Sequence, residues 1–313
     1  MIKGVEPVIV LGLQDHNLNE IENAYPDTKL TARGSVLKIT GSSEDVDAIK
    51  GIINDLIDLA DRQGSISEDD LQTILTLKKS DPEANVPKFL ESDIILKTFT
   101  GETVRAKTPG QRKIVEATAQ NDITFAIGPA GTGKTYTSVA LAVRALKERA
   151  VKKIVLCRPA VEAGESLGFL PGGLREKIDP YLRPLYDSLE EMIDYETLEL
   201  NMAKNTIEIA PLAYMRGRTL NNAFVILDEA QNATKMQMKM FLTRLGINSR
   251  AIITGDITQT DLPSRQKSGL ISVQNILDGI KGIQFVYLDQ QDVVRHRIIR
   301  EIISAYEKYE EKQ

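Results

Sequence analysis

The sequence predicts an α/β protein: a three-layer core with a parallel sheet, preceded by a small α+β module. Three observations predict this fold. A glycine-rich loop stands between an apolar strand and an amphipathic helix at 123–148. Short unbroken apolar runs then alternate with helical stretches, which is the pattern of a parallel sheet buried on both faces. The N-terminal part has a different, mixed pattern. We therefore expect a module over 1–62, a helical linker over 63–95 and the α/β domain over 96–313.

The composition is that of a globular chain. Its 313 residues are 42% hydrophobic, which is enough for a sizeable core. The net charge of −5 argues against wholesale coating by nucleic acid, so any nucleic-acid site must be local. Cys157 is the only cysteine, which excludes an intrachain disulfide, and its apolar surroundings predict burial. No run approaches the roughly 18 apolar residues of a membrane span and no signal peptide is recognisable, so we expect a cytoplasmic protein without a membrane contact.

The N-terminal module is expected to have the order βαββα. We predict a strand at 5–13, a helix at 18–26, a hairpin at 29–40 and a capped amphipathic helix that begins after Ser42 or Ser43. This order resembles half of a KH domain, but the sequence lacks the GXXG clamp that grips the RNA backbone in that domain. RNA contact and a docking or oligomerisation role are both open for this module.

The elements that lead into the α/β domain have clear boundary signals. The linker holds one helix before a proline-containing stretch at 81–87. The segment 96–108 is typical of a hairpin with Gly101 in its turn. Thr108 as the N-cap and Pro109 at the first helical position predict a helix that ends just before the next strand.

The segment GPAGTGKT at 128–135 fits the phosphate-binding pattern G-x-x-x-x-G-K-[ST]. Its glycines let consecutive backbone amides turn around a β-phosphate, Lys134 neutralises the β/γ charge, and Thr135 supplies a hydroxyl to Mg²⁺. The preceding strand and following helix are the context that this chemistry requires. The residues expected to hold the nucleotide here are Gly128, Pro129, Ala130, Gly131, Thr132, Gly133, Lys134, Thr135 and Tyr136.

Further apolar runs predict the other strands of the parallel sheet, at 154–157, 207–210, 224–227, 251–254 and 285–288.

Two of these strands are followed by residues suited to phosphoryl chemistry. Asp228 stands at the carboxyl end of its strand, where an acidic residue reaches the Mg²⁺ shell, and Glu229 can polarise a water for in-line attack on the γ-phosphate. The segment ITGDITQTD places Gln259 on a loop where its amide either holds the attacking water, touches the γ-phosphate or simply belongs to a Gly-Asp turn. The sequence has no N-K-x-D motif to read guanine, so ATP is the expected nucleotide.

Two other features leave alternatives open. The amide of Gln111, one helix upstream of the loop, either reads the edge of adenine or faces water. The glycine-rich loop at 164–173 carries Phe169 between Arg158 and Arg175. This aromatic ring either stacks on single-stranded bases or anchors the loop by packing.

Together these motifs are similar to the PhoH-like family of bacterial ATPases. The similarity covers 108–306 and is carried by GPAGTGKT, CRPAVEAGESLGFLPGG, MRGRTLNNAFVILDEAQN, TGDITQTDLP and DVVRH. It implies a single RecA-like core related to superfamily 1 helicases. The roles it implies for individual residues are those given above for Lys134, Thr135, Asp228 and Glu229, with Gln111 as adenine reader and Gln259 as γ-phosphate sensor. One departure is Arg297, where family members often have proline.

The resemblance also implies partners. Family members are associated with RNA metabolism and with an endoribonuclease that matures ribosomal RNA, so single-stranded RNA and such a nuclease are the expected partners. Some relatives carry a PIN nuclease domain, which nothing in this sequence resembles. Superfamily 1 helicases complete their ATP site with arginines from a second RecA-like core, and this chain has one core. We therefore expect a ring-shaped homo-oligomer, specifically a hexamer, in which a neighbouring subunit supplies an arginine. The candidates are Arg295 and its rivals Arg216, Arg218 and Arg297, with plain surface charges as the alternative.

The leading hypothesis is Mg²⁺-dependent ATP hydrolysis coupled to RNA binding or remodelling. The alternative is a nucleotide-switched adaptor that regulates a partner ribonuclease without moving along RNA. A small-molecule kinase is disfavoured, because Glu229 and the Gln259 loop serve to activate water, which a kinase excludes.

Overall fold

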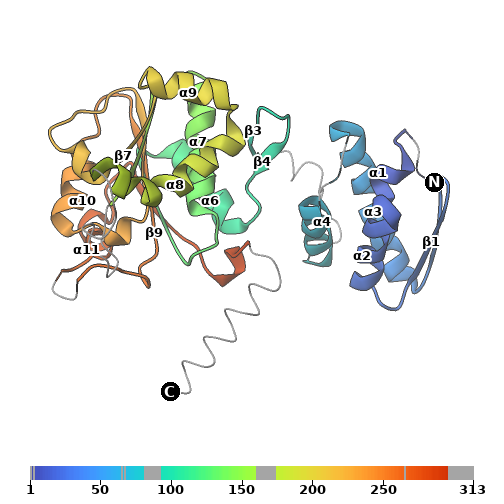
Figure 1. Cartoon of the computed structure of the whole chain (residues 1–313). Helices are drawn as coiled ribbons and strands as arrows, with labels where there is room; N and C mark the ends of the chain where they lie inside the picture. The colour runs from blue at the N-terminus through green and yellow to red at the C-terminus, as the bar shows by residue number, and fades with distance from the viewer. Residues whose placement is uncertain are drawn as a thin grey trace. The chain divides into compact units, whose positions relative to one another are not determined.

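The computed structural model describes residues 2, 4–64, 66, 68–80, 93–159, 174–263 and 266–294. The chain divides into two compact units, Met1–Asp93 and Ile94–Gln313 (Figure 1). Each unit has a hydrophobic core of its own.

The first unit is a small α+β module. Its elements are α1 (Pro7–Leu11), η1 (Leu13–Asp15), α2 (His16–Ala24), β1 (Lys29–Arg33), β2 (Val36–Thr40), α3 (Ser43–Gln63) and α4 (Glu68–Ser80). The predicted hairpin is confirmed, because β1 and β2 pair antiparallel with Lys29 opposite Thr40. The predicted helix cap is confirmed as well, since the Ser42 side chain accepts a hydrogen bond from the backbone of Asp45.

Two expectations for this unit differ from the structure. The first element is a helix rather than a strand, so the order βαββα is wrong at its first position. The apolar run there is too short for its periodicity to separate strand from helix, while Pro7 occupies a first-turn helical position and Val10 and Leu11 are buried. Helix α4, which lies in the range expected to be linker, packs its apolar side chains into the core of the first unit.

The second unit is built on a six-stranded sheet with the order β10-β5-β9-β8-β6-β7. Every neighbouring pair of strands is parallel, which confirms the predicted parallel sheet. Its strands are β5 (Ile123–Ile127), β6 (Lys153–Arg158), β7 (Ile207–Pro211), β8 (Ala223–Leu227), β9 (Arg250–Gly255) and β10 (Ile283–Tyr287). All six predicted strands are present, although β10 begins two residues before the predicted run at 285–288.

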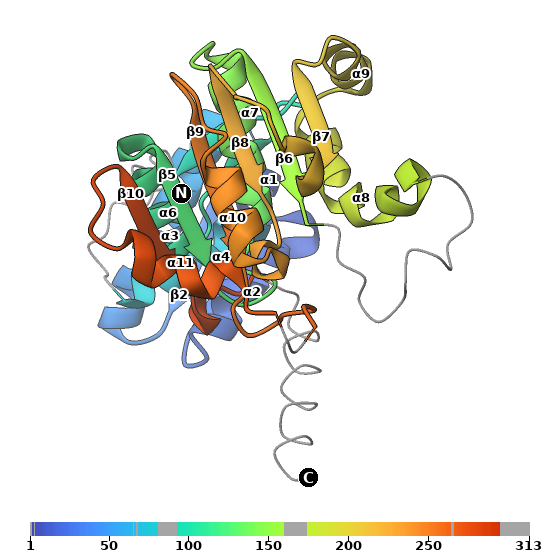
Figure 2. The ribbon, with the colours of Figure 1, turned by 90° about the vertical axis from the view of Figure 1, so that its left-hand side faces the viewer.

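Helices cover both faces of this sheet, as Figure 2 shows. The helices are α6 (Pro109–Gln120), α7 (Lys134–Lys147), α8 (Leu174–Met192), α9 (Tyr195–Ala203), α10 (Lys235–Leu242) and α11 (Gly269–Leu277). Alternate strand residues point to opposite faces. The strand residues on one face pack against α6, α7, α8 and α9 in a core that includes Ile154, Phe224 and Ile252. The strand residues on the other face pack against α10 and α11.

The expected hairpin precedes this core as β3 (Ile94–Lys97) and β4 (Thr103–Arg105), which are antiparallel. Helix α6 is capped by Thr108, as predicted, with Pro109 at its first position. Cys157 is fully buried in the second core cluster, and burial raises the pKa of its thiol far above the usual range. Within the described ranges, no helix has the length and apolar character needed to cross a membrane.

Candidate nucleotide site

The glycine-rich loop joins β5 to the first turn of α7. Gly131 and Gly133 have φ values of 82° and 74°, a left-handed conformation that glycine adopts without steric cost. Left-handed residues in such a loop let successive backbone N–H groups point inward at the helix N-terminus, where the helix dipole also favours an anion. The Lys134 ammonium donates to the carbonyl oxygens of Gly128 and Pro129, both at 2.7 Å. The cationic group is thus held within the loop itself.

The acidic residue after β8 meets the loop. Thr135 Oγ1 donates a hydrogen bond of 2.7 Å to Asp228 Oδ1, although the two residues are 93 positions apart in the chain. Thr254, near the end of β9, donates to the same oxygen at 2.6 Å. Asp228 is only 2% exposed. Since β9 lies between β5 and β8, the carboxyl ends of three parallel strands converge on this carboxylate.

The donors gathered here fit Mg²⁺ better than a softer ion. Thr135 and Asp228 offer a hydroxyl and a carboxylate, which are hard oxygen ligands. Within the described part of the chain, no group of three or more His, Cys, Asp or Glu side chains could hold a metal ion. Mg²⁺ commonly binds one or two protein oxygens together with substrate phosphates. The site therefore suits an ion that arrives with a nucleotide.

Glu229 has an unusual backbone conformation beside Asp228. Its φ of 52° is left-handed, which is costly for a residue with a side chain and persists where the surroundings enforce it. The carboxylate is held by Arg158 Nη2, 3.0 Å from Oε1, and by the side-chain amide of Gln231, which donates to Oε2. The side chain is 37% exposed, so water can reach it.

The loop after β9 is tied to the same carboxylate. The Gln231 side-chain oxygen accepts from the backbone N–H of Asp256 at 3.0 Å. Asp256 in turn accepts two hydrogen bonds from Thr258, at 2.9 Å from its backbone and 2.6 Å from its hydroxyl. This folded turn carries Gln259, which is exposed at the carboxyl edge of the sheet.

Gln111 and Tyr136 lie beside the loop, and the side chain of each already contacts other parts of the protein. The Gln111 amide accepts from Lys107 N at 2.7 Å and donates to Thr132 O at 2.9 Å, and the residue is 4% exposed. It braces the phosphate-binding loop, so reading adenine would require it to exchange these partners. The Tyr136 side chain packs against the core, and burial, followed by the charge of Glu191, raises its pKa to about 12.

The arginines expected to act in trans differ in their surroundings. Arg295 and Arg297 lie outside the described residues, as do Phe169 and the side chain of Arg175. Arg218 forms a two-pronged ion pair with Glu208 on β7, with distances of 2.6 and 2.7 Å. Arg216 is exposed.

The Arg218 pair gives a pH-dependent contribution to stability. Hydrogen bonds from Arg218 lower the pKa of Glu208 from its ordinary value of 4.5. Because the folded pKa lies below the unfolded one, the stabilisation is present above the unfolded pKa and is lost as the pH falls through the folded pKa. We expect Glu208→Gln to lower the free energy of unfolding by about 1 kcal/mol at pH 7, a modest value because both side chains are partly exposed. Denaturant unfolding of both proteins between pH 7 and pH 3 should show this difference shrinking at low pH; a difference that stays constant would contradict it.

Sequence reasoning missed three contributors to the site. The sequence patterns include Thr254 and Gln231 only as members of motifs and Arg158 only as a neighbour of a loop. Arg158 and Thr254 stand at the carboxyl ends of their strands, and Gln231 lies three residues after Asp228. Position at the ligand-binding edge of a parallel sheet is the signal that could have identified them.

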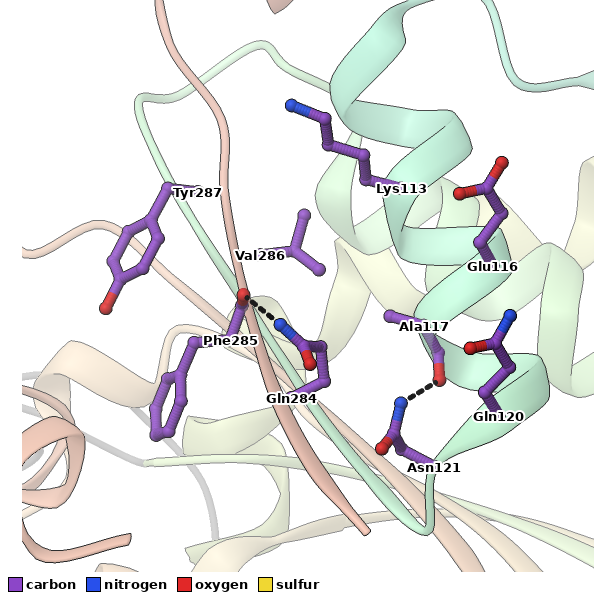
Figure 3. Close-up of a pocket in the computed structure, with 9 residues that line it drawn as sticks. All are labelled: Lys113, Glu116, Ala117, Gln120, Asn121, Gln284, Phe285, Val286 and Tyr287. Carbon is purple, nitrogen blue, oxygen red and sulfur yellow. Dashed lines mark hydrogen bonds between the residues drawn. The ribbon is translucent and has the colours of Figure 1, made fainter. Parts of the chain in front are cut away.

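A separate cavity of about 420 Å³ lies between α6 and β10 (Figure 3). Its walls are formed by Lys113, Glu116, Ala117, Gln120, Asn121, Gln284, Phe285, Val286 and Tyr287. None of these is among the residues predicted to bind or hydrolyse a nucleotide.

Comparison with known proteins gives a family match over the second unit and relatives that match nearly all of the chain. The family model described as PhoH-like protein matches residues 103–307. The PhoH-like protein of Bacillus subtilis (strain 168) is 49% identical over 303 residues, which cover 97% of this chain and 94% of that protein. The PhoH-like protein of Synechocystis sp. (strain ATCC 27184 / PCC 6803 / Kazusa) is 48% identical over 307 residues, covering 97% and 92%. Among solved structures, the Sulfolobus solfataricus SWI2/SNF2 ATPase core in complex with dsDNA matches 47% of this chain and 30% of its own with 16% identity, but its TM-score of 0.31 is too low to support an argument.

Proposed function

Because this chain belongs to the PhoH-like family, we propose that it is an Mg²⁺-dependent ATPase whose hydrolysis is coupled to binding or remodelling RNA. The observation that carries the proposal is the 2.7 Å hydrogen bond between Thr135 and Asp228. It joins the phosphate-binding loop to the acidic pair after β8, so that one site holds groups for binding the phosphates, the metal and the attacking water.

The residues divide the chemistry among them. The loop amides and Lys134 bind the β- and γ-phosphates and offset their negative charge. Thr135 and Asp228 would hold Mg²⁺, which when bound neutralises charge that develops on the phosphate oxygens. Glu229, fixed by two donors and open to solvent, orients a water for in-line attack and accepts its proton. Gln259 senses the γ-phosphate from the adjoining loop.

The RNA part of the proposal is supported by the family resemblance and by an exposed aromatic residue that follows the edge strand β7. Tyr214 is 55% exposed in η2 (Leu212–Met215), directly after β7, and Arg216 follows it. An exposed aromatic ring beside a cation can stack on an unpaired base while the cation meets a phosphate. The partner expected from the resemblance is a ribonuclease of ribosomal RNA maturation.

Turnover measurements test the coupling. We expect the purified protein to release phosphate from ATP with no acceptor present, and single-stranded RNA to increase the rate. Stimulation by a ribonuclease partner alone, with RNA without effect, would favour the nucleotide-switched adaptor instead. No release of free phosphate, with ADP formed only when a small-molecule acceptor is present to take the phosphoryl group, would indicate a kinase.

A ring-shaped homo-oligomer follows from the need for an arginine at the transition state. We expect Arg295→Ala to preserve ATP binding and to lower turnover by roughly 10³-fold, the lower end of the effect of an arginine finger. Unchanged turnover would remove Arg295 from the site.

Mixing two inactive variants tests whether the arginine acts in trans. Lys134→Ala retains Arg295, and Arg295→Ala retains the phosphate-binding loop, so mixed oligomers should recover activity if the arginine crosses between subunits. The backbone N–H of Val294 donates to Gly131 O at 2.9 Å, so the residue just before Arg295 contacts the phosphate-binding loop of its own subunit, and action in cis is the alternative that the mixture tests. Failure to recover activity in a mixture shown to form mixed oligomers would contradict action in trans.

A further inference from the structure

Arg158 connects three parts of the second unit at the edge where the nucleotide site lies. It is the last residue of β6, and the strand register sets Cys157 opposite Leu227 on β8. Arg158 and Asp228, which follow this pair in the chain, therefore lie side by side, and Asp228 N donates to Cys157 O at 2.8 Å. The Arg158 side chain is 19% exposed, so its charge is largely removed from solvent.

Each nitrogen of the guanidinium faces a different group. Nη2 lies 3.0 Å from Glu229 Oε1, and Nε lies 3.7 Å from Asp228 Oδ2. Nη1 donates to the backbone carbonyl of Tyr181 at 2.6 Å. The guanidinium is planar and rigid, so fixing one nitrogen also fixes the direction in which the others point.

The Tyr181 carbonyl belongs to α8, a helix with prolines inside it. Pro184 has no backbone N–H to donate to the carbonyl of Pro180 four residues earlier, and its ring crowds the preceding turn, in which Tyr181 follows Pro180. Arg158 donates to the Tyr181 carbonyl from outside the helix, and this bond sets the orientation of the guanidinium toward Glu229.

We propose that Arg158 is a positioning residue for hydrolysis: anchored on the α8 backbone, it holds the Glu229 carboxylate at the angle needed to orient the attacking water. The proposal rests on the proposed ATP hydrolysis at this site. Gln231 holds the other carboxylate oxygen, so the two donors together define the direction of the remaining lone pairs. Arg158 acts through Glu229 and not on the nucleotide.

The test separates positioning from nucleotide binding. We expect Arg158→Ala to lower kcat for ATP by about 10- to 100-fold, the effect of a misplaced catalytic group, while the Kd of a fluorescent ATP analogue changes less than about threefold. Arg158→Lys should recover part of the loss, because an ammonium can pair with Glu229 but cannot also reach all the other groups. A loss that appears mainly in analogue affinity, or a rise in kcat, would overturn the proposal.

A double-mutant cycle tests whether the effect passes through Glu229. In the Glu229→Gln background, the further change Arg158→Ala should alter the residual single-turnover rate by less than about twofold. Independent, multiplicative losses would contradict the proposal. Arg183→Ala is the matched control, since Arg183 lies on α8 and is ion-paired to carboxylates of that helix at the surface, and this variant should retain wild-type kcat.

ATP hydrolysis by the wild-type protein distinguishes failure of the proposed function from failure of the role proposed for Arg158. If the wild-type protein does not hydrolyse ATP, the proposed function fails. If it does and Arg158→Ala retains full kcat with a normal thermal unfolding midpoint, only the role of Arg158 fails.

Discussion

Replacing Lys134 by alanine is expected to reduce kcat/KM for ATP by roughly 10²- to 10⁴-fold. The ammonium donates hydrogen bonds to two loop carbonyls and would donate them to phosphate oxygens when a nucleotide binds. Each charge-assisted hydrogen bond contributes about 1.5–3 kcal/mol. Two such bonds correspond to about 3–6 kcal/mol, which gives this range of rates. Both binding and chemistry depend on the same charge, so both should fall.

Isothermal titration with an ATP analogue and a phosphate-release assay would measure the two losses separately. Lys239→Ala is a suitable control, because Lys239 is an exposed lysine of a helix in the same unit. Near-normal analogue binding and turnover in Lys134→Ala, with a folded protein, would remove the glycine-rich loop from the proposed function.

Glu229→Gln is expected to give a different result: nucleotide binding is retained and hydrolysis falls by roughly 10²- to 10⁴-fold, the usual contribution of a general base. Glutamine has nearly the same shape as glutamate, but its neutral amide is far less able to accept a proton from water. The change leaves Lys134, Thr135 and Asp228 in place, so the groups for phosphates and metal are unaffected.

Single-turnover assays with excess enzyme, together with analogue titration, separate these quantities. The exposed Glu196 in the first turn of α9 provides the control substitution Glu196→Gln, which should retain normal rates. If Glu229→Gln hydrolyses ATP at the wild-type rate, the proton acceptor must be another group. If it fails to bind the analogue, Glu229 supports the fold of the site and not the chemistry.

Much of the fold could be predicted because local signals and tertiary structure agree in the second unit. Unbroken apolar runs bounded by turns led to all six strands, and Thr108 with Pro109 located the start of α6. The prediction of a strand for the first element was wrong for a physical reason: the five residues PVIVL are too few to show either a helical or an alternating period. Its conformation is decided by packing against α3, which is not a local property.

The site could be predicted only in part. The loop and the acidic pair have recognisable local patterns, and the structure brings Lys134, Thr135, Asp228 and Glu229 to one edge of the sheet; their catalytic roles stay predictions. The contacts of Arg158 and Gln231 depend on which strands are neighbours. Strand order is a property of the assembled sheet that no single segment encodes, so these residues could not be assigned partners in advance.

The place of β9 in the sheet also governs when the site can exist during biosynthesis. β9 is inserted between β5 and β8, yet it is made after both, and β10 then completes the outer side of β5. A nascent chain that ends before 250 lacks the strand that joins the loop to the carboxylates. Long-range pairing of this kind is slow to form because distant segments must close first. The emerging polypeptide thus cannot assemble the complete candidate nucleotide site until most of its length has left the ribosome.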